Sequence, residues 1–329
     1  MKKTILRAYA RLIAVTGVRV QKGQSIIINA ELDQPEFVTM LVEECYRAGA
    51  GKVTVEWNHQ PLEKLHVRHR SVKTLSMLEP WEVAKLQHQT DTLPGRIYLD
   101  SADPDGLRGM NQEKRAKGMQ ARYKIIKPYR DKMEGRYQWC IAAVPGAAWA
   151  KKVFPNETKS RAIEKLWEAI LHTCRMDGGD GVQAWEAHNS DLESRCKYLN
   201  SLGIETLEYH ASNGTDLRVG MIPEARFCGG GEYSIGGTFF NPNLPTEECF
   251  ISPKRGEAEG IVNSSKPLSY NGELIENYQD RTREEMRAMG VNDSMIHEDF
   301  MIGTPDLEIT AHCRDGKTVK IFENGGWAF

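Results

Sequence analysis

The 329-residue sequence contains no apolar run approaching the roughly 18 residues that a membrane span requires. It has no Cys-x-x-Cys pair, no internal repeat and no low-complexity tract. Neither sign of charge is in excess, because 43 Lys and Arg residues face 45 Asp and Glu residues and the formal net charge is −2. These absences argue against a membrane protein, a zinc ribbon, a disordered chain and a dedicated nucleic-acid-binding protein.

The cysteines and the amino terminus bear on the cellular compartment. Seven cysteines, an odd number at wide spacing, are typical of reduced thiols in a cytosolic protein. Each is expected to pack as a small apolar side chain more often than to act as a nucleophile. The basic start is followed by an apolar stretch, Ile5–Val15, that Arg7 and Arg11 interrupt, which argues against a signal peptide. We therefore expect a cytoplasmic protein.

The first 200 residues alternate strand and helix signals. The strand-like runs, rich in β-branched and aromatic residues, are Ser25–Ala30, Lys52–Trp57, Arg96–Asp100 and Tyr137–Val144. The helical patterns between and after them are Pro35–Arg47, Glu79–Gln89, Asn111–Lys127 and Lys159–Cys174. Strands separated by helix-length segments predict an α/β fold with a mostly parallel sheet.

The remainder of the chain carries a different pattern. Its short alternating runs are Glu205–Tyr209, Asp216–Val219, Tyr233–Phe240, Gly260–Ser264, Glu273–Ile275, Leu307–His312 and Lys317–Phe322. Glycine, proline and asparagine separate these runs at short intervals, which predicts antiparallel β structure. The length suggests about two domains. We place an α/β domain at residues 1–207 and a β-rich domain at residues 208–329.

A histidine and an aspartate two positions apart lie in the segment MIHEDFMIG. On a β-strand, His297 and Asp299 face the same side and Glu298 faces the other. An imidazole beside a carboxylate suits Zn, Mn or Co, and such ions can activate a water molecule in a hydrolase. Taken alone, the pair is more often a structural hydrogen-bonded pair on an exposed edge.

A second pair of acidic residues lies in the segment NLPTEECF. Pro245 and Thr246 close a turn, and Glu247 and Glu248 follow at the expected start of a strand. One of the two carboxylates is therefore expected to face a cleft and the other to face away. Adjacent glutamates are usually a solvated surface, so the pair by itself is weak evidence for a site.

Two further features have simpler interpretations. The triple glycine at Gly229, Gly230 and Gly231 lacks the strand and helix context of a phosphate-binding loop, so we interpret it as a turn that needs positive φ. His188 follows Trp185 and precedes Leu192 at three- to four-residue steps. This spacing favours a packed helix residue over a metal ligand.

Taken together, these segments resemble the thermophilic metallo-aminopeptidase family, the aminopeptidase T and aminopeptidase S group. The resemblance runs over nearly the whole chain. The segments that carry it are WEAHNSDLESRCKYLN, GTDLRV, NPNLPTEECFISP, KPLSYNGELIEN and GVNDSMIHEDFMIG.

The resemblance implies a metal site and an activity. It implies that Glu248, the second glutamate of the PTEE motif, and the pair His297 and Asp299 are metal ligands. It further implies Zn, Co or Mn, two ions per subunit, a metal-bound water that attacks the amino-terminal peptide bond of peptide substrates, and a homodimer that encloses its active sites. It implies neither a nucleic-acid nor a membrane partner.

The sequence departs from the family between Glu276 and Gly290. The family has a much longer segment there, with a bridging glutamate in a Leu-Gly-Glu motif, an Asp-Glu-Asn-Ala motif and a catalytic tyrosine. Neither motif occurs in the 329 residues, so no catalytic residue is assigned. Glu248, His297 and Asp299 with water could hold one metal ion, as in catalytic zinc sites, but two clustered ions need more ligands.

The sequence thus supports two functional hypotheses. The first is a metal-dependent aminopeptidase that releases amino-terminal residues, with activity impaired by the missing segment. The alternative is a non-catalytic homodimeric peptide-binding scaffold that keeps the family fold. The three retained ligand positions favour the first hypothesis, and the missing bridging motifs favour the second.

Overall fold

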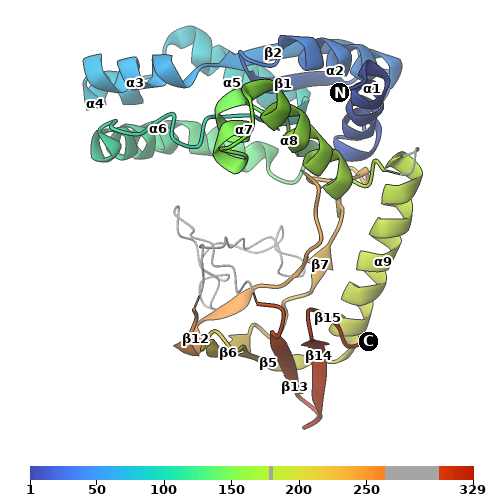
Figure 1. Ribbon diagram of the computed structural model, residues 1–329. Helices are drawn as coiled ribbons and strands as arrows, with labels where there is room; N and C mark the ends of the chain where they lie inside the picture. Colours follow the sequence, from blue (N-terminus) through green and yellow to red (C-terminus); the bar gives the residue numbers. More distant parts are fainter. Residues whose placement is uncertain (178–180, 264–303) are drawn as a thin grey trace. The chain divides into compact units, whose positions relative to one another are not determined.

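The computed structural model describes residues 1–177, 181–263 and 304–329. The chain forms two compact units (Figure 1). The first unit comprises Met1–His188 and Gly231–Thr246, and the second comprises Asn189–Gly230 and Glu247–Phe329. The chain therefore leaves or re-enters the first unit after His188, Gly230 and Thr246. A division between residues 207 and 208 would fall inside β5 (Ile204–His210).

The first unit is built on a five-stranded parallel sheet in the order β10-β4-β3-β1-β2. Its strands are β1 (Ser25–Glu31), β2 (Lys52–Asn58), β3 (Gly95–Asp100), β4 (Trp139–Ala143) and β10 (Asn243–Leu244). The first four lie where the sequence predicts strands, and the α/β class is confirmed. The fifth strand, β10, comes from the NLPTEECF segment and returns to pair beside β4.

The buried strand β1 shows why this sequence forms a parallel sheet. Ile26, Ile28 and Ala30 are fully buried, and Ile27 between them is buried as well. A strand covered on both faces needs an almost continuous apolar run rather than an alternating one. Ile26, Ile28 and Ala30 belong to one core cluster with the apolar faces of the surrounding helices, including Tyr9 and Leu41.

Helices surround this sheet and extend beyond it (Figure 1). They are α1 (Lys3–Leu12), the π-helical turn Ile13–Gly17, α2 (Pro35–Arg47), α3 (Gln60–His69), α4 (Val72–Ser76), α5 (Pro80–Thr92), α6 (Gln112–Met133), α7 (Ala147–Val153) and α8 (Lys159–Thr173), and α9 (Gly181–Ser201) continues into the second unit. Of the helices in the described ranges, none is long and apolar enough to cross a membrane.

Two helix ends show where local signals succeed and fail. Helix α2 spans the predicted range, with proline in its first turn and Gly49 at a φ of +108° just past its end. The sequence predicts a helix that ends at Lys127, but α6 continues through Pro128 to Met133. Proline leaves the carbonyl of Lys124 without its helical donor. Lys124 is exposed, so water can replace that donor.

The second unit holds a six-stranded antiparallel sheet in the order β12-β6-β5-β13-β14-β15. The strands besides β5 are β6 (Asp216–Met221), β12 (Pro253–Ile261), β13 (Glu308–Cys313), β14 (Thr318–Glu323) and β15 (Gly326–Trp327). Leu207, Ala311 and Ile321 from the sheet pack with Cys196 and Leu199 of α9. The predicted β-rich character of this part is confirmed.

Three predicted strands need comment. The run Tyr233–Phe240 is not one strand but a hairpin of β8 (Glu232–Tyr233) and β9 (Phe239–Phe240), because Gly237 turns the chain at a φ of +81°. Of the run Gly260–Ser264, Gly260 and Ile261 end the longer strand β12, Val262 and Asn263 follow it, and Ser264 lies outside the described residues. The predicted strand Glu273–Ile275 lies outside the described residues.

Candidate metal site

The NPNLPTEECF segment is fixed to the parallel sheet before it reaches its glutamates. The backbone N–H of Asn241, a fully buried residue, donates to the carbonyl of Gly17 over 2.9 Å. The N–H of Ile141 in β4 donates to the carbonyl of Pro242 over 2.7 Å. The next residues, Asn243 and Leu244, pair with β4 as strand β10. The motif therefore starts from a rigid sheet edge.

A hydrogen bond from His188 fixes Thr246, two residues after Leu244. Its Nε2 donates to the carbonyl oxygen of Thr246 over 2.8 Å, and both residues are buried. Because a carbonyl oxygen can only accept, Nε2 carries the proton in this contact. The His188 ring also meets Trp185 edge to face, with centroids 5.3 Å apart and an interplanar angle of 86°. The prediction that His188 is a packed helix residue is confirmed.

Glu247 and Glu248 follow Thr246 and are both exposed. The strand that the sequence places at these glutamates, β11, starts only at Cys249 and comprises Cys249–Phe250. The argument that one carboxylate faces a cleft and the other faces away requires both residues to be in a strand. The strand expected at these two glutamates is therefore wrong, and which carboxylate faces a cleft stays a prediction.

The short antiparallel pair of strands that follows fixes the chain on the carboxy-terminal side of Glu248. Strand β11 pairs antiparallel with β7 (Cys228–Gly229), and Cys249 lies opposite Gly229. A Cβ atom added at Gly229 would lie 2.4 Å from the carbonyl oxygen of Glu248. Gly230 has a φ of +75°, so the predicted turn with positive φ is confirmed. The close approach at Gly229 was not predicted, although a run of glycines is the signal for such contacts.

Two thiols lie beside the candidate ligand. All seven cysteines fall within the described ranges and none forms a disulfide there, and Cys196 of α9 is buried while Cys249 is half-buried. A hydrogen bond from Cys196 lowers the pKa of the Cys249 thiol, and the same bond raises the pKa of Cys196. The bond favours a proton on Cys196.

The other two predicted ligands, His297 and Asp299, lie outside the described residues, so their convergence with Glu248 stays a prediction. Within residues 1–177, 181–263 and 304–329, no group of three or more His, Cys, Asp or Glu side chains is placed to hold a metal ion. A centre with three protein ligands that includes Glu248 therefore takes ligands from outside these ranges.

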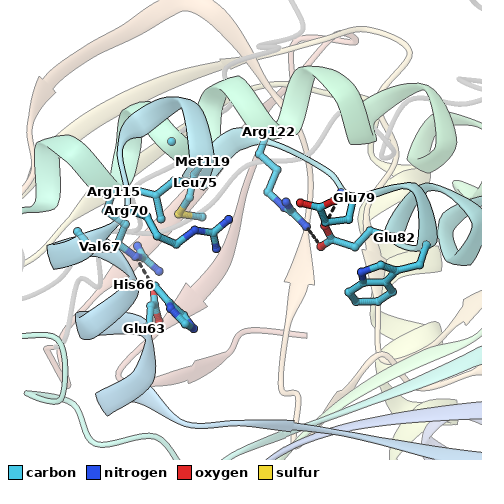
Figure 2. A pocket seen from close by; sticks show the side chains of 12 residues that line it. Glu63, His66, Val67, Arg70, Leu75, Glu79, Glu82, Arg115, Met119 and Arg122 are labelled. Atoms are coloured by element: carbon cyan, nitrogen blue, oxygen red, sulfur yellow. Dashed lines mark hydrogen bonds and ion pairs between the residues drawn. The ribbon is translucent and has the colours of Figure 1, made fainter.

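A pocket of about 410 Å³ lies among α3, α4, α5 and α6 of the first unit (Figure 2). Its walls combine apolar side chains such as Val67 and Trp81 with paired charges. Arg115 Nε lies 2.6 Å from Glu63, and Arg122 lies 2.5 Å from Glu82. Burial alone would raise the pKa of Glu82, but hydrogen bonds from the Glu79 backbone and from Arg122 lower it. None of the predicted metal ligands lines this pocket.

The fold agrees with the comparisons between this chain and known proteins. The sequence profile of the thermophilic metalloprotease (M29) family matches residues 2–280 and 276–327. The two matches together cover almost the whole chain, so the protein belongs to the thermophilic metalloprotease (M29) family. As the family name states, its members are metal-dependent proteases.

Individual relatives extend this assignment. Aminopeptidase AmpS of Bacillus subtilis (strain 168) is 29% identical over 404 residues, covering 98% of this chain and 98% of that protein. Aminopeptidase T of Thermus thermophilus is 34% identical over 275 residues, covering 83% of this chain and 67% of that protein. The solved structure of wild-type AmpT from Thermus thermophilus superposes with a TM-score of 0.86 at 25% identity, covering 99% and 100% of the two chains.

The match between this chain and its family is interrupted near residue 280. The family profile matches in two pieces that meet at residues 276–280 rather than in one. The alignment with AmpS extends over 404 residues, more than the 329 of this chain, so it contains gaps on this chain's side.

Proposed function

We propose that the protein is a metal-dependent aminopeptidase that releases amino-terminal residues from peptides. The family membership over almost the whole chain carries this proposal. The aminopeptidase names of its relatives and the exposed Glu248 in a firmly anchored PTEE motif support it. The free cysteines support the cytoplasmic location that the sequence predicts.

The proposed donor set fits a divalent ion in its chemistry. Glu248, His297 and Asp299 offer two carboxylates and one imidazole, which are ligands that Zn, Co and Mn accept. A bound ion of this kind supplies a water molecule acidic enough to act as a nucleophile near neutral pH. The role of this chain is to hold the ion: Glu248 presents its carboxylate from the short connection between β10 and β11.

We further propose that the chain lacks a ligand-bearing segment between Glu276 and Gly290. The break in the family match at residues 276–280 supports this, as do the gaps in the alignment with AmpS. Three protein ligands and water complete the shell of one catalytic metal, whereas two neighbouring ions share additional carboxylates. The expected stoichiometry is therefore one ion per chain instead of the two of the family, with reduced activity.

Metal removal tests the proposal. Dialysis against a chelator should lower the hydrolysis of leucine para-nitroanilide by at least about 100-fold, because the nucleophilic water loses the ion that acidifies it. Adding back Zn, Co or Mn one at a time should restore hydrolysis with at least one of them. Activity that survives complete metal removal, checked by plasma emission, would contradict the proposal.

The same experiment tests the alternative of a non-catalytic peptide-binding scaffold. The absence of the bridging motifs favours that alternative. A scaffold would bind peptides, measured by fluorescence anisotropy, and hydrolyse none of them with any metal. Hydrolysis restored by a metal excludes it.

We also propose that the protein is a homodimer, as the family resemblance implies. Light scattering should then give about twice the chain mass of 37.2 kDa at micromolar concentrations. A single species at the chain mass across that range would refute the dimer.

A further inference from the structure

Two cysteines that are distant in the sequence meet in the second unit. Cys196 lies on α9 and is only 7% exposed, and Cys249 is the half-buried first residue of β11. Their thiols are hydrogen-bonded to each other. Both residues belong to the second unit, so the contact lies within one compact body. Neither residue is among the proposed metal ligands.

The pairing of β7 with β11 directs Cys249 towards α9. Residues directly opposite each other in an antiparallel pair project their side chains to the same face. Cys249 lies opposite Gly229, and a Cβ atom added at Gly229 would lie 3.1 Å from Cys196 Sγ and 3.4 Å from Cys249 Cα. The face of the strand pair that carries the Cys249 side chain is therefore the face that Cys196 covers. Because Gly229 has no side chain, it leaves room beside the Cys196 sulfur.

A separate contact gives the same location for the Cys249 sulfur. Cys249 Sγ lies 3.9 Å from the carbonyl oxygen of Leu192. Leu192 is one helical turn before Cys196, so the sulfur of Cys249 lies beside the turn of α9 that ends at Cys196. A disulfide needs two sulfurs that can approach to about 2 Å. Two thiols that are already in hydrogen-bond contact need only a short approach to form that bond.

Cys228, on the same strand pair, is a less suitable partner. It precedes Gly229 in β7, so its side chain projects to the face opposite the one that meets Cys196. Its Sγ lies 3.8 Å from the carbonyl oxygen of Arg226. Cys228 is half-buried, as Cys249 is, and therefore provides a matched control.

We propose that Cys196 and Cys249 are the site of a reversible disulfide that forms when a hydroperoxide oxidises them. Cys249 is the more exposed of the two. Its sulfur attacks one oxygen of hydrogen peroxide, the O–O bond breaks, one water leaves and a sulfenic acid forms. The sulfur of Cys196 then attacks the sulfur of Cys249, the S–O bond breaks and a second water leaves. The two thiols lose two electrons and two protons, and the peroxide is reduced to two molecules of water.

The disulfide joins the two chain segments that make up the second unit. Cys196 belongs to Asn189–Gly230 and Cys249 to Glu247–Phe329, and the chain between these segments belongs to the first unit. A reducing environment keeps both thiols reduced until peroxide rises, and a dithiol reductant breaks the bond again. The site is independent of the proposed peptidase activity.

Peroxide treatment of the full chain at neutral pH, followed by mass spectrometry, tests the proposal. Two of the seven thiols should disappear in a thiol titration. A digest without reductant should contain a crosslinked peptide pair that joins Cys196 to Cys249, and dithiothreitol should restore both thiols. Cys140 and Cys174, fully buried in the first unit, should stay reduced because peroxide does not reach them.

Three variants separate this pair from general thiol oxidation. Cys228→Ser should form the same crosslink as wild type. Cys249→Ser should form none and should leave Cys196 reduced. Cys196→Ala removes the second thiol, so Cys249 should accumulate as a sulfenic acid that dimedone traps. Circular dichroism checks the fold of each variant, and if Cys196→Ala does not fold, Cys249→Ser at its half-buried position carries the test.

Three outcomes overturn the inference. The first is a folded wild-type protein that keeps all seven thiols under conditions that oxidise free glutathione. The second is a crosslink from either cysteine to Cys228 in place of the predicted pair. The third concerns selectivity: protein unfolded in urea should form mixed pairs, and an equally selective Cys196–Cys249 crosslink there would show that the native geometry plays no part.

Discussion

Glu248→Ala is expected to lower divalent metal affinity by at least about 100-fold and to abolish peptide hydrolysis. The reason is that the substitution removes one of three proposed protein ligands, and loss of a group that merely orients a ligand already costs about 10- to 100-fold. The exposed glutamate makes no contribution to the apolar core, so the protein should remain folded. Metal content after dialysis and titration calorimetry measure the effect.

Glu247→Ala is the matched control for this substitution. It removes the same charge from the neighbouring exposed position, so a general electrostatic effect would lower affinity equally in both variants. A ligand role for Glu248 requires Glu247→Ala to be clearly milder. Equal loss in the two variants would show that the charge of the segment matters and that Glu248 is no ligand.

The largest effect on stability is expected at Trp185. Trp185→Ala should lower the free energy of unfolding by about 3–5 kcal/mol, as truncation of buried aromatic residues does. The indole is fully buried, donates to the carbonyl of Cys174 and contacts His188. Urea unfolding followed by circular dichroism is the suitable measurement, because the substitution removes a fluorophore.

Two further substitutions calibrate this result. Trp185→Phe keeps a ring in the core but leaves the Cys174 carbonyl without its donor, so a smaller cost of about 1–3 kcal/mol is expected. Trp81→Ala, at a tryptophan that is 65% exposed, should change stability by less than about 1 kcal/mol. Similar costs at positions 185 and 81 would contradict the assignment of Trp185 to the core.

Much of the fold could be predicted because its signals are local. The apolar run of β1 and the amphipathic pattern of α2 each reflect burial that a dozen neighbouring residues reveal. The failures occurred where local rules compete with tertiary contacts or solvent. Pro128 does not end α6, and the strand-like run Tyr233–Phe240 folds back on itself.

The candidate site was predictable only in part. The PTEE motif predicts Glu248 as a ligand, which stays a prediction, but the strand expected at its two glutamates begins only at Cys249. The hydrogen bond from His188 to Thr246 could not be predicted from the sequence, because the residues around each partner do not indicate a contact so distant in the chain. The contact of Gly229 with the Glu248 backbone likewise depends on the pairing of β7 with β11.

The returning strand β10 has a consequence for hybrid genes made from this protein and its relatives. Residues 231–246 belong to the first unit although they follow much of the second in the sequence. A single crossover near codon 188 would therefore combine a sheet from one parent with its last strand from the other. Leu244 would have to fit a foreign β4 and a foreign core. Exchanging a whole unit between parents requires recombination at codons 188, 230 and 246 together.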